Sequence, residues 1–317
     1  MSKHDETTED GNAAALQASV TRMLQDLAVK PLMPGLYLVA TPIGNLGDIS
    51  LRALDCLARA DLVACEDTRH SGRLLAHFGL KARLLPYHEH NAANARPKLL
   101  SALLDGAAVA LISDAGTPLI SDPGYKLVRE ALAEDIAVTA IPGASASLTG
   151  LSVSGLPSDS FFFAGFLPPK SAARKTRLEE LARVPGSLLF YETGARLAAA
   201  LTDMAEILGD REAATAKELT KLHEQVARGT LPALAESFTG GEPPKGEFVV
   251  IVAPPSQAAK EASDAEIVAA LENALATESM RDAVQAVTDA LGTKRKRVYR
   301  LGLALQQGKD GNGGEAR

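Results

Sequence analysis

The chain has 317 residues, a formal net charge of −6 and no tryptophan, and only 4% of its residues are aromatic. This length exceeds what one hydrophobic core usually supports, so we expect two domains with additional segments. The low aromatic content excludes a conventional base-stacking platform, and the net acidity by itself argues against a nucleic-acid partner. The sequence has no apolar run as long as a membrane helix, and its acidic start is unlike a signal peptide. These features predict a cytoplasmic protein without membrane contact.

The N-terminal extension, residues 1–34, is expected to precede the first domain. Residues 1–12 are polar and predict disorder. Residues 13–29 place Leu16, Val20 and Leu27 at the spacing of an amphipathic helix.

Residues 35–165 predict an α/β domain in which apolar strands alternate with helices. The predicted strands are 36–40, 62–65, 109–113 and 138–141, and the predicted helices are 51–60, 74–78, 98–104, 124–133 and 145–151. Such alternation is typical of a largely parallel sheet covered on both faces. Cys56 and Cys65 lie in apolar patterns without metal-ligand spacing, and we interpret them as reduced core thiols.

A glycine- and proline-containing segment, residues 163–170, marks the predicted boundary to a second α/β domain, residues 166–255. We expect the ligand cleft beside this boundary. The predicted helices of the second domain are 171–181 and 195–208, and its predicted strands are 187–191 and 246–252. A linker to Ser263 leads into a helical region, residues 264–308, and the tail from Gln306 is expected to be loose.

Three strand ends of the first domain run into loops of small and turn-forming residues. The loops are Thr41–Asp48, Ser113–Gly124 and the segment that begins at Pro142 and enters a helix at Ser145. Loops at the ends of parallel strands can converge on one crevice, which is where open α/β sheets place their ligands. Ordinary turns without a ligand are the alternative for each loop.

Five motifs in a fixed order resemble those of one protein family. They are Thr41–Asp48, Cys65–Arg69, Tyr87–Asn91, Ser113–Gly124 and Glu218–Lys221. On these motifs the chain is similar to the small-subunit ribosomal RNA cytidine 2'-O-methyltransferase I family, within the tetrapyrrole (corrin/porphyrin) methylase superfamily. The resemblance runs from about Gly35 to Pro254 and is looser in the C-terminal helical region.

The resemblance implies a two-domain tetrapyrrole-methylase-like α/β fold with the cofactor cleft between the domains, plus a small C-terminal helical region. It implies S-adenosyl-L-methionine as methyl donor and a homodimer. The implied reaction is 2'-O-methylation of a cytidine ribose in the decoding region of 16S rRNA, within the small ribosomal subunit.

In the superfamily, the methyl donor lies against the three loops at the strand ends. Carried over residue by residue, the resemblance implies donor contacts from Pro42, Asp114, Gly116, Thr117, Pro118, Ile120, Ser145 and Ala146. Thr117 stands where the superfamily commonly has aspartate, so Asp114 and Asp122 are candidates for the missing carboxylate. A turn and a helix cap are the alternative role of Asp122, since Asp-Pro-Gly suits both.

Methyl transfer to oxygen is an in-line displacement, so the protein must align donor and acceptor and help to remove the hydroxyl proton. Asp67 and Arg69 follow the strand 62–65, which a simple winding places next to the first loop. Asp67 is a candidate proton acceptor and Arg69 a candidate phosphate ligand. A salt bridge that holds the loop is the alternative.

The loop His88–Asn91 is the densest polar cluster of the chain. His90 is a candidate catalytic residue, and His88 and Asn91 are candidates for hydrogen bonds to a flipped nucleotide or to the attacking hydroxyl. A structural hydrogen-bond network within the loop is an alternative of comparable weight. Since the loop has no further cysteine or histidine at ligand spacing, we expect no metal.

Two basic clusters depart from the acidic average. Residues 281–300 contain six basic residues and two acidic ones, and four basic residues lie within residues 170–177. Each cluster is more often a solvated helix face, but two of them together with the resemblance favour RNA contact. Substrate contacts are expected from Asn45, His88, Asn91, Lys221, Lys294, Arg295, Lys296 and Arg297.

The charged run at residues 217–224 could close over the substrate, and an exposed helix face is its alternative.

Two other functions compete with ribosomal RNA methylation. One is methylation of a tetrapyrrole carbon, which the superfamily also performs, and the other is a non-enzymatic RNA-binding assembly factor.

Overall fold

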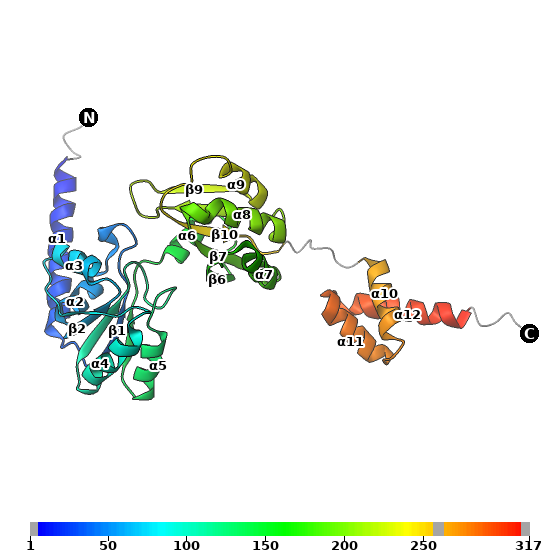
Figure 1. Ribbon diagram of the computed structural model, residues 1–317, viewed down its shortest axis with the longest axis horizontal. Coiled ribbons are helices and arrows are strands. Elements are labelled where there is room, and N and C mark those ends of the chain that lie inside the picture. Colours follow the sequence, from blue (N-terminus) through cyan, green and yellow to red (C-terminus); the bar gives the residue numbers. More distant parts are fainter. Residues whose placement is uncertain (1–5, 256–262, 312–317) are drawn as a thin grey trace, which may run out of the picture. The chain divides into compact units, whose positions relative to one another are not determined.

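The structure is a computed structural model that describes residues 6–255 and 263–311. The chain divides into two compact units, Met1–Pro254 and Pro255–Arg317 (Figure 1). The first unit contains two five-stranded sheets, and the second consists of helices in its described residues.

The first sheet is parallel throughout, as the alternating pattern predicts. Its strands are β1 (Gly35–Val39), β2 (Leu62–Cys65), β3 (Leu84–Pro86), β4 (Ala108–Ile112) and β5 (Val138–Ile141), in the order β3-β2-β4-β1-β5. Strand β3 was not predicted, because three residues are too few to show a period. The expectation that β2 lies next to β1 is wrong, since β4 pairs with both strands and separates them.

Helices cover both faces of this sheet, which confirms the predicted layering. They are α2 (Leu51–Arg59), α3 (Thr68–His77), α4 (Ala92–Leu104) and α5 (Tyr125–Ala133), with the short 3-10 helix η1 (Leu46–Asp48) in the first loop. Helices α2 and α3 contribute to a core on one face, and α4 and α5 to a core on the other. Helices α3 and α4 each begin six residues earlier than expected, because their first turns are polar and carry no apolar periodicity.

Both cysteines lie in the core of the first sheet as free thiols, which confirms their predicted role. Burial raises the pKa of the Cys56 thiol to about 12. A thiol with this pKa is protonated at neutral pH and behaves as a small apolar side chain.

The second sheet is mixed. Its strands are β6 (Phe161–Phe166), β7 (Ser187–Thr193), β8 (Glu212–Lys217), β9 (Gln225–Thr230) and β10 (Glu247–Val252), in the order β6-β7-β10-β8-β9. Strands β6 and β7 are parallel and the other neighbours are antiparallel. The expected domain boundary after Gly165 therefore falls inside a strand of the second sheet.

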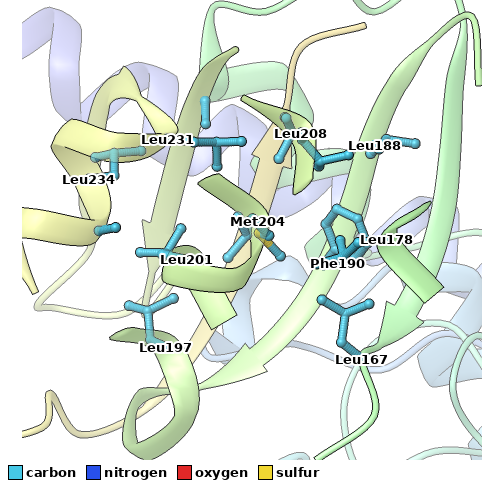
Figure 2. Close-up of a cluster of buried hydrophobic side chains, with 14 of the residues drawn as sticks. Leu167, Leu178, Leu188, Phe190, Leu197, Leu201, Met204, Leu208, Leu231 and Leu234 are labelled. Atoms are coloured by element: carbon cyan, nitrogen blue, oxygen red, sulfur yellow. The ribbon is translucent and has the colours of Figure 1, made fainter. Parts of the chain in front are cut away.

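Two layers of helix sandwich the second sheet. Helices α7 (Ser171–Leu181), α8 (Gly194–Leu208) and α9 (Leu231–Ser237) pack on one face, where Phe190, Met204 and Leu231 belong to one core (Figure 2). Helix α6 (Ala146–Ser154) follows β5 of the first sheet but packs on the opposite face of the second, against β7, β8 and β10. Helix α6 thus ties the two sheets together.

Several elements of the second sheet were not predicted, namely β6, β8, β9 and α9. Strand β8 is rich in alanine, which has a low strand propensity, and its buried residues are held by pairing with β9 and β10 on its two sides. The charged run at residues 217–224 is a turn between β8 and β9, so the alternative of an exposed helix face is wrong.

The ends of the chain are more helical than expected. Helix α1 (Glu6–Val29) confirms the helix predicted at 13–29, but the expected disorder is wrong for residues 6–12, and residues 1–5 lie outside the described residues. Helix α12 (Arg295–Gly311) likewise continues through residues 306–311, where a loose tail was expected. The rest of that tail and residues 256–262 of the linker lie outside the described residues.

In its described residues the C-terminal unit is a three-helix module, formed by α10 (Asp264–Ala274), α11 (Met280–Leu291) and α12. Ile267, Leu271, Val284 and Val298 are buried in its own core. Among the described helices of the whole chain, none combines the length and apolar character needed to cross a membrane.

Candidate functional site

The three predicted loops contact one another at the ends of β1, β4 and β5. The backbone N–H of Thr41 donates to the carbonyl of Gly116 at 2.9 Å, and the N–H of Gly116 donates back to Thr41 at 3.0 Å. The Thr117 hydroxyl donates to the carbonyl of Ala144 at 3.2 Å. These contacts confirm that the loops converge.

A cavity of about 240 Å³ lies where these loops face the second sheet. One wall comes from the first loop, the loop after β4 and the start of α6. The other comes from β6, β7, β8, β10 and the turn after β8. The lining residues are Ile43, Asp114, Ala115, Gly116, Thr117, Ile120, Ser121, Asp122, Ser145, Ala146, Phe166, Tyr191, Glu192, Ala216, Glu218, Leu219, Lys221, Glu247, Phe248 and Val249.

The structure brings together seven of the residues proposed from sequence. Asp114, Gly116, Thr117, Ile120, Ser145, Ala146 and Lys221 line the cavity. The set of lining residues does not include Pro42, Pro118, Asn45, Asp67, Arg69, His88, His90 or Asn91. Lys294, Arg295, Lys296 and Arg297 belong to the C-terminal unit.

The cavity wall is acidic. Five carboxylates lie along it, from Asp114, Asp122, Glu192, Glu218 and Glu247, and Lys221 is its one basic side chain. The Lys221 ammonium is 3.0 Å from Oε1 of Glu218, so one carboxylate neutralises it. The hydrogen bond from Lys221 lowers the pKa of Glu218. This charge distribution suits a ligand with positive charge.

Backbone strain is concentrated in the loops of the cavity. Of the five non-glycine residues with positive φ in the described parts of the chain, four are Leu119, Ser121, Glu218 and Thr220. Leu119 and Ser121 belong to the loop after β4, and Glu218 and Thr220 to the turn after β8. Such conformations cost free energy and persist where the surroundings enforce them, commonly at functional sites.

A close approach of Gly44 joins the first loop to the turn after β8. A Cβ atom at Gly44 would lie 2.4 Å from Cγ of Lys221, so any other residue there would displace the Lys221 side chain. The predicted substrate residue Lys221 is thus held against the first loop.

Asp67 and Arg69 form a local pair beside the β4 loop. The Asp67 carboxylate accepts from the Arg69 backbone at 2.8 Å, which caps α3, and lies 2.7 Å from the Arg69 guanidinium. These bonds hold the pKa of Asp67 well below its usual range. The Asp67 backbone N–H donates to Oδ1 of Asp114 at 3.1 Å. Arg69 is exposed over 88% of its side chain and faces solvent.

The polar loop after β3 is held by its own asparagine. Oδ1 of Asn91 accepts from the backbone of His88 at 2.8 Å, and Nδ2 donates to the carbonyl of Pro86 at 2.9 Å. His90 is exposed, and its ring lies 6.1 Å from that of His88. These bonds favour the structural network for Asn91 and leave His90 open to solvent.

Sequence reasoning missed the apolar wall of the second sheet. Tyr191 accepts a hydrogen bond from the backbone of Ser147 at 3.2 Å, and its ring packs edge-on against Phe163 and Phe166. The lining residues missed are Ile43, Phe166, Tyr191, Ala216, Leu219, Phe248 and Val249. Five of them lie in strands with an ordinary strand pattern, and the pairing of these strands places them at the cavity, whereas Ile43 lies in the first loop and Leu219 in the turn after β8.

The two basic clusters differ in their partners. Arg174 is buried and lies 2.6 Å from Asp203, and Lys175 lies 2.6 Å from Glu206. The prediction of RNA contact is therefore wrong for Arg174. In the second cluster Lys294, Arg295 and Lys296 are exposed, whereas Arg297 lies 2.7 Å from Asp264.

Comparisons with known proteins give the chain its relatives. The family described as Tetrapyrrole (Corrin/Porphyrin) Methylases matches residues 35–235, and the RsmI C-terminal HTH domain matches residues 261–306. A ribosomal RNA small subunit methyltransferase I of Mesorhizobium japonicum is 50% identical over 91% of this chain and 98% of its own length. The protein of that name from Erythrobacter litoralis is 52% identical over 90% of this chain and 100% of its own.

Solved structures of low sequence identity share the fold. A cobalt precorrin-4 methyltransferase has a TM-score of 0.51 at 16% identity, covering 69% of this chain and 94% of its own. A diphthine synthase has a TM-score of 0.54 at 17% identity, covering 69% of this chain and 89% of its own.

Proposed function

The chain belongs to the ribosomal RNA small subunit methyltransferase I family of tetrapyrrole methylases, and on this premise we propose that it methylates the ribose 2'-hydroxyl of a cytidine in 16S rRNA. It is a methyltransferase, and its methyl donor is S-adenosyl-L-methionine. The observation that supports the proposal is the acidic cavity enclosed by the three loops and the second sheet.

The cavity fits the donor in charge and in polarity. S-adenosyl-L-methionine carries a sulfonium and an ammonium, and five carboxylates against one lysine favour such a cation. When bound, it supplies an electrophilic methyl group. We assign its binding to the loop after β4 and the start of α6, through Asp114, Gly116, Thr117, Ile120, Ser145 and Ala146. Pro42 and Pro118 shape the loops behind these residues.

The acceptor RNA is assigned to exposed groups. Asn45, Arg69 and His90 are exposed beyond the cavity lining, and we propose that they contact the RNA together with His88. In the C-terminal unit, residues 264–308, the exposed Lys294, Arg295 and Lys296 are proposed to bind phosphates. We further propose that the substrate is the small ribosomal subunit, and that the enzyme is a cytoplasmic homodimer.

The test is an incubation with labelled donor and three acceptors: purified small subunit, naked 16S rRNA and a porphyrinoid precursor. We expect label on the RNA and a modified nucleotide linkage that resists alkaline hydrolysis. Mass spectrometry should find the methyl group on a cytidine ribose. Label on the porphyrinoid alone would indicate a tetrapyrrole methylase. Absence of label on every acceptor, with retained RNA binding, would indicate an assembly factor. Sedimentation of the protein reports the dimer.

A further inference from the structure

The proposed reaction requires a group that removes the proton from the attacking hydroxyl, and this inference rests on that proposed function. Most carboxylates near the cavity are already engaged. Oδ1 of Asp114 accepts from the Asp67 backbone, and Glu218 pairs with Lys221. Glu192 is 1% exposed; its Oε1 accepts from the backbone of Thr193, and its Oε2 lies 3.4 Å from the Arg196 guanidinium. Asp67, the candidate from sequence, is held by Arg69 outside the set of lining residues.

Asp122 also lines the cavity, and it does not cap the helix that follows it. Helix α5 begins after Gly124, which is its N-cap, and it has no side-chain cap hydrogen bond. The alternative of a helix cap, raised by Asp-Pro-Gly, is therefore wrong. The carboxylate of Asp122 is half-buried at the cavity wall.

The backbone around Asp122 is fixed on both sides. Leu119 and Ser121 have φ values of +73° and +63°, which tertiary packing must enforce. A Cβ atom at Gly124 would lie 2.8 Å from Cδ2 of Leu111 in β4, so the turn is packed directly on the sheet. A Cβ atom at Gly165 would lie 3.3 Å from Oγ of Ser121, which brings β6 of the second sheet against this loop. Asp122 is thus held where the two sheets meet.

We propose that Asp122 is the general base of methyl transfer, accepting the proton of the ribose 2'-hydroxyl. As the hydroxyl oxygen forms its bond to the methyl carbon, the bond from that carbon to sulfur breaks and its electron pair stays on sulfur. The hydroxyl proton passes to the carboxylate of Asp122. The products are a methyl ether, a neutral thioether and a protonated carboxyl, so charge and atoms balance.

The surroundings of Asp122 support this role. Burial, and then the negative charges of Glu66 and Asp114, raise the pKa of Asp122 to about 6, against a lowering by a hydrogen bond from Ser113. A base with a pKa near the working pH is ionised in the resting enzyme and still binds a proton well. The other charged groups that line this cavity are Glu192 of β7, Glu218 and Lys221 of the turn after β8, and Glu247 of β10. Asp67 and Arg69, at the start of α3, pair with each other outside the lining.

The experiment compares the full-length protein with D122N, which keeps the shape of the side chain and removes the base. Donor affinity is measured by calorimetry, and single-turnover methylation of the small subunit is measured from about pH 5 to pH 9. We expect D122N to bind the donor within about threefold of the parent, and to lose about 100-fold or more in rate. The parent rate should rise with pH and level off above about pH 6, and D122N should lack this rise.

A matched control and a second variant complete the design. D105N makes the same change at the exposed C-cap of α4. Asp105 precedes β4, whereas the cavity loop follows it, so D105N should leave both rate and affinity unchanged. D122E keeps a carboxylate and should retain the pH-dependent rise at a reduced rate.

A D122N enzyme with the parent rate and pH profile would overturn the proposal. So would a variant whose donor affinity falls tenfold while its rate at saturating donor is unchanged, because Asp122 would then contact the donor ribose. If the parent itself transfers no methyl group to the small subunit, the proposed function fails first and the assignment of Asp122 falls with it.

Discussion

At the scale of single residues, the cavity holds a carboxyl group in surroundings that lower the stability of the folded state. Asp122 is a clear case, because a carboxyl whose pKa is raised in the folded state is held in an environment that opposes its ionised form. Thr117 has a different role in the cavity, because it connects two of its loops. Its hydroxyl joins the β4 and β5 loops through a hydrogen bond to the carbonyl of Ala144.

We predict that D122N is more stable than the parent at high pH. The folded pKa of Asp122 is about 6 and its ordinary value is 3.8, so the ionised carboxylate destabilises the folded state above about pH 6. This penalty declines as the pH falls and is absent well below pH 4. Thermal unfolding should show D122N with a Tm about 2 °C or more above the parent at pH 8, and a much smaller gain near pH 4. An equal difference at both pH values would contradict the assigned ionisation.

We predict that T117Y loses donor binding without unfolding. Thr117 lines the cavity, and its hydroxyl bonds to Ala144, so a tyrosine ring there would fill the space of the ligand and separate the two loops. Calorimetry should show donor affinity reduced about 100-fold or more, with Tm within a few degrees of the parent. Undiminished affinity would move the donor site away from this loop.

At the scale of elements, helix α6 couples the two sheets. It begins at Ala146 on the cavity wall and packs against β10 through Gly150, where a Cβ atom would lie 2.9 Å from Cγ1 of Val249. This close approach requires glycine and fixes the start of the helix. A substitution at Gly150 should therefore shift the start of α6 and alter the cavity wall.

We predict that G150V lowers both stability and donor affinity. The added side chain overpacks the contact with β10, at a cost of about 2 kcal/mol or more, which corresponds to a fall in Tm of about 5 °C. S152V introduces the same side chain on the exposed face of α6 and should change neither Tm nor affinity much. Equal effects of the two variants would show that strand-forming side chains simply weaken the helix.

The basic residues at the start of helix α12 differ in exposure and in partners. Lys294, Lys296 and Arg300 are exposed, whereas the Arg297 guanidinium pairs with Asp264 at the start of α10. We predict that the triple change K294A/K296A/R300A weakens small-subunit binding and reduces its salt dependence, with Tm unchanged. R297A should instead lower the Tm of the C-terminal unit. If the triple variant binds as tightly as the parent across salt concentrations, α12 does not contact phosphate.

At the scale of the whole molecule, the cavity belongs to the first unit, and the proposed RNA contacts are divided between the first unit and the C-terminal unit. The cavity lies within Met1–Pro254, and the C-terminal unit has its own core of six buried residues. We predict that a chain ending at Pro254 folds and binds the donor within about twofold of the full chain, but loses most methylation of the small subunit. Calorimetry and the labelled-donor assay measure the two properties. Full methylation by the shortened chain would remove the proposed role of residues 264–308.

The sequence by itself determined the first sheet and its loops. Hydrophobic strands that end in turn-forming residues leave a strong local signal, and from Leu36 to Leu151 this signal predicted every strand except the three-residue β3. The resemblance carried by five motifs correctly indicated the family and the two-sheet architecture. Helices α7 and α8 of the second domain were also predicted, and the apolar periodicity is clear in α8.

Tertiary structure alone decided which residues share the cavity. The apolar wall from β7, β8 and β10 has no local signal, because its residues meet the loops through strand pairing and the packing of α6. The tertiary structure also decided which partners the charged side chains have. Asp67 caps α3, Arg174 is buried against Asp203, and Asp122 faces the cavity. Whether a charged side chain binds a ligand or stabilises the fold depends on its partners in space, and the order of residues does not fix those partners.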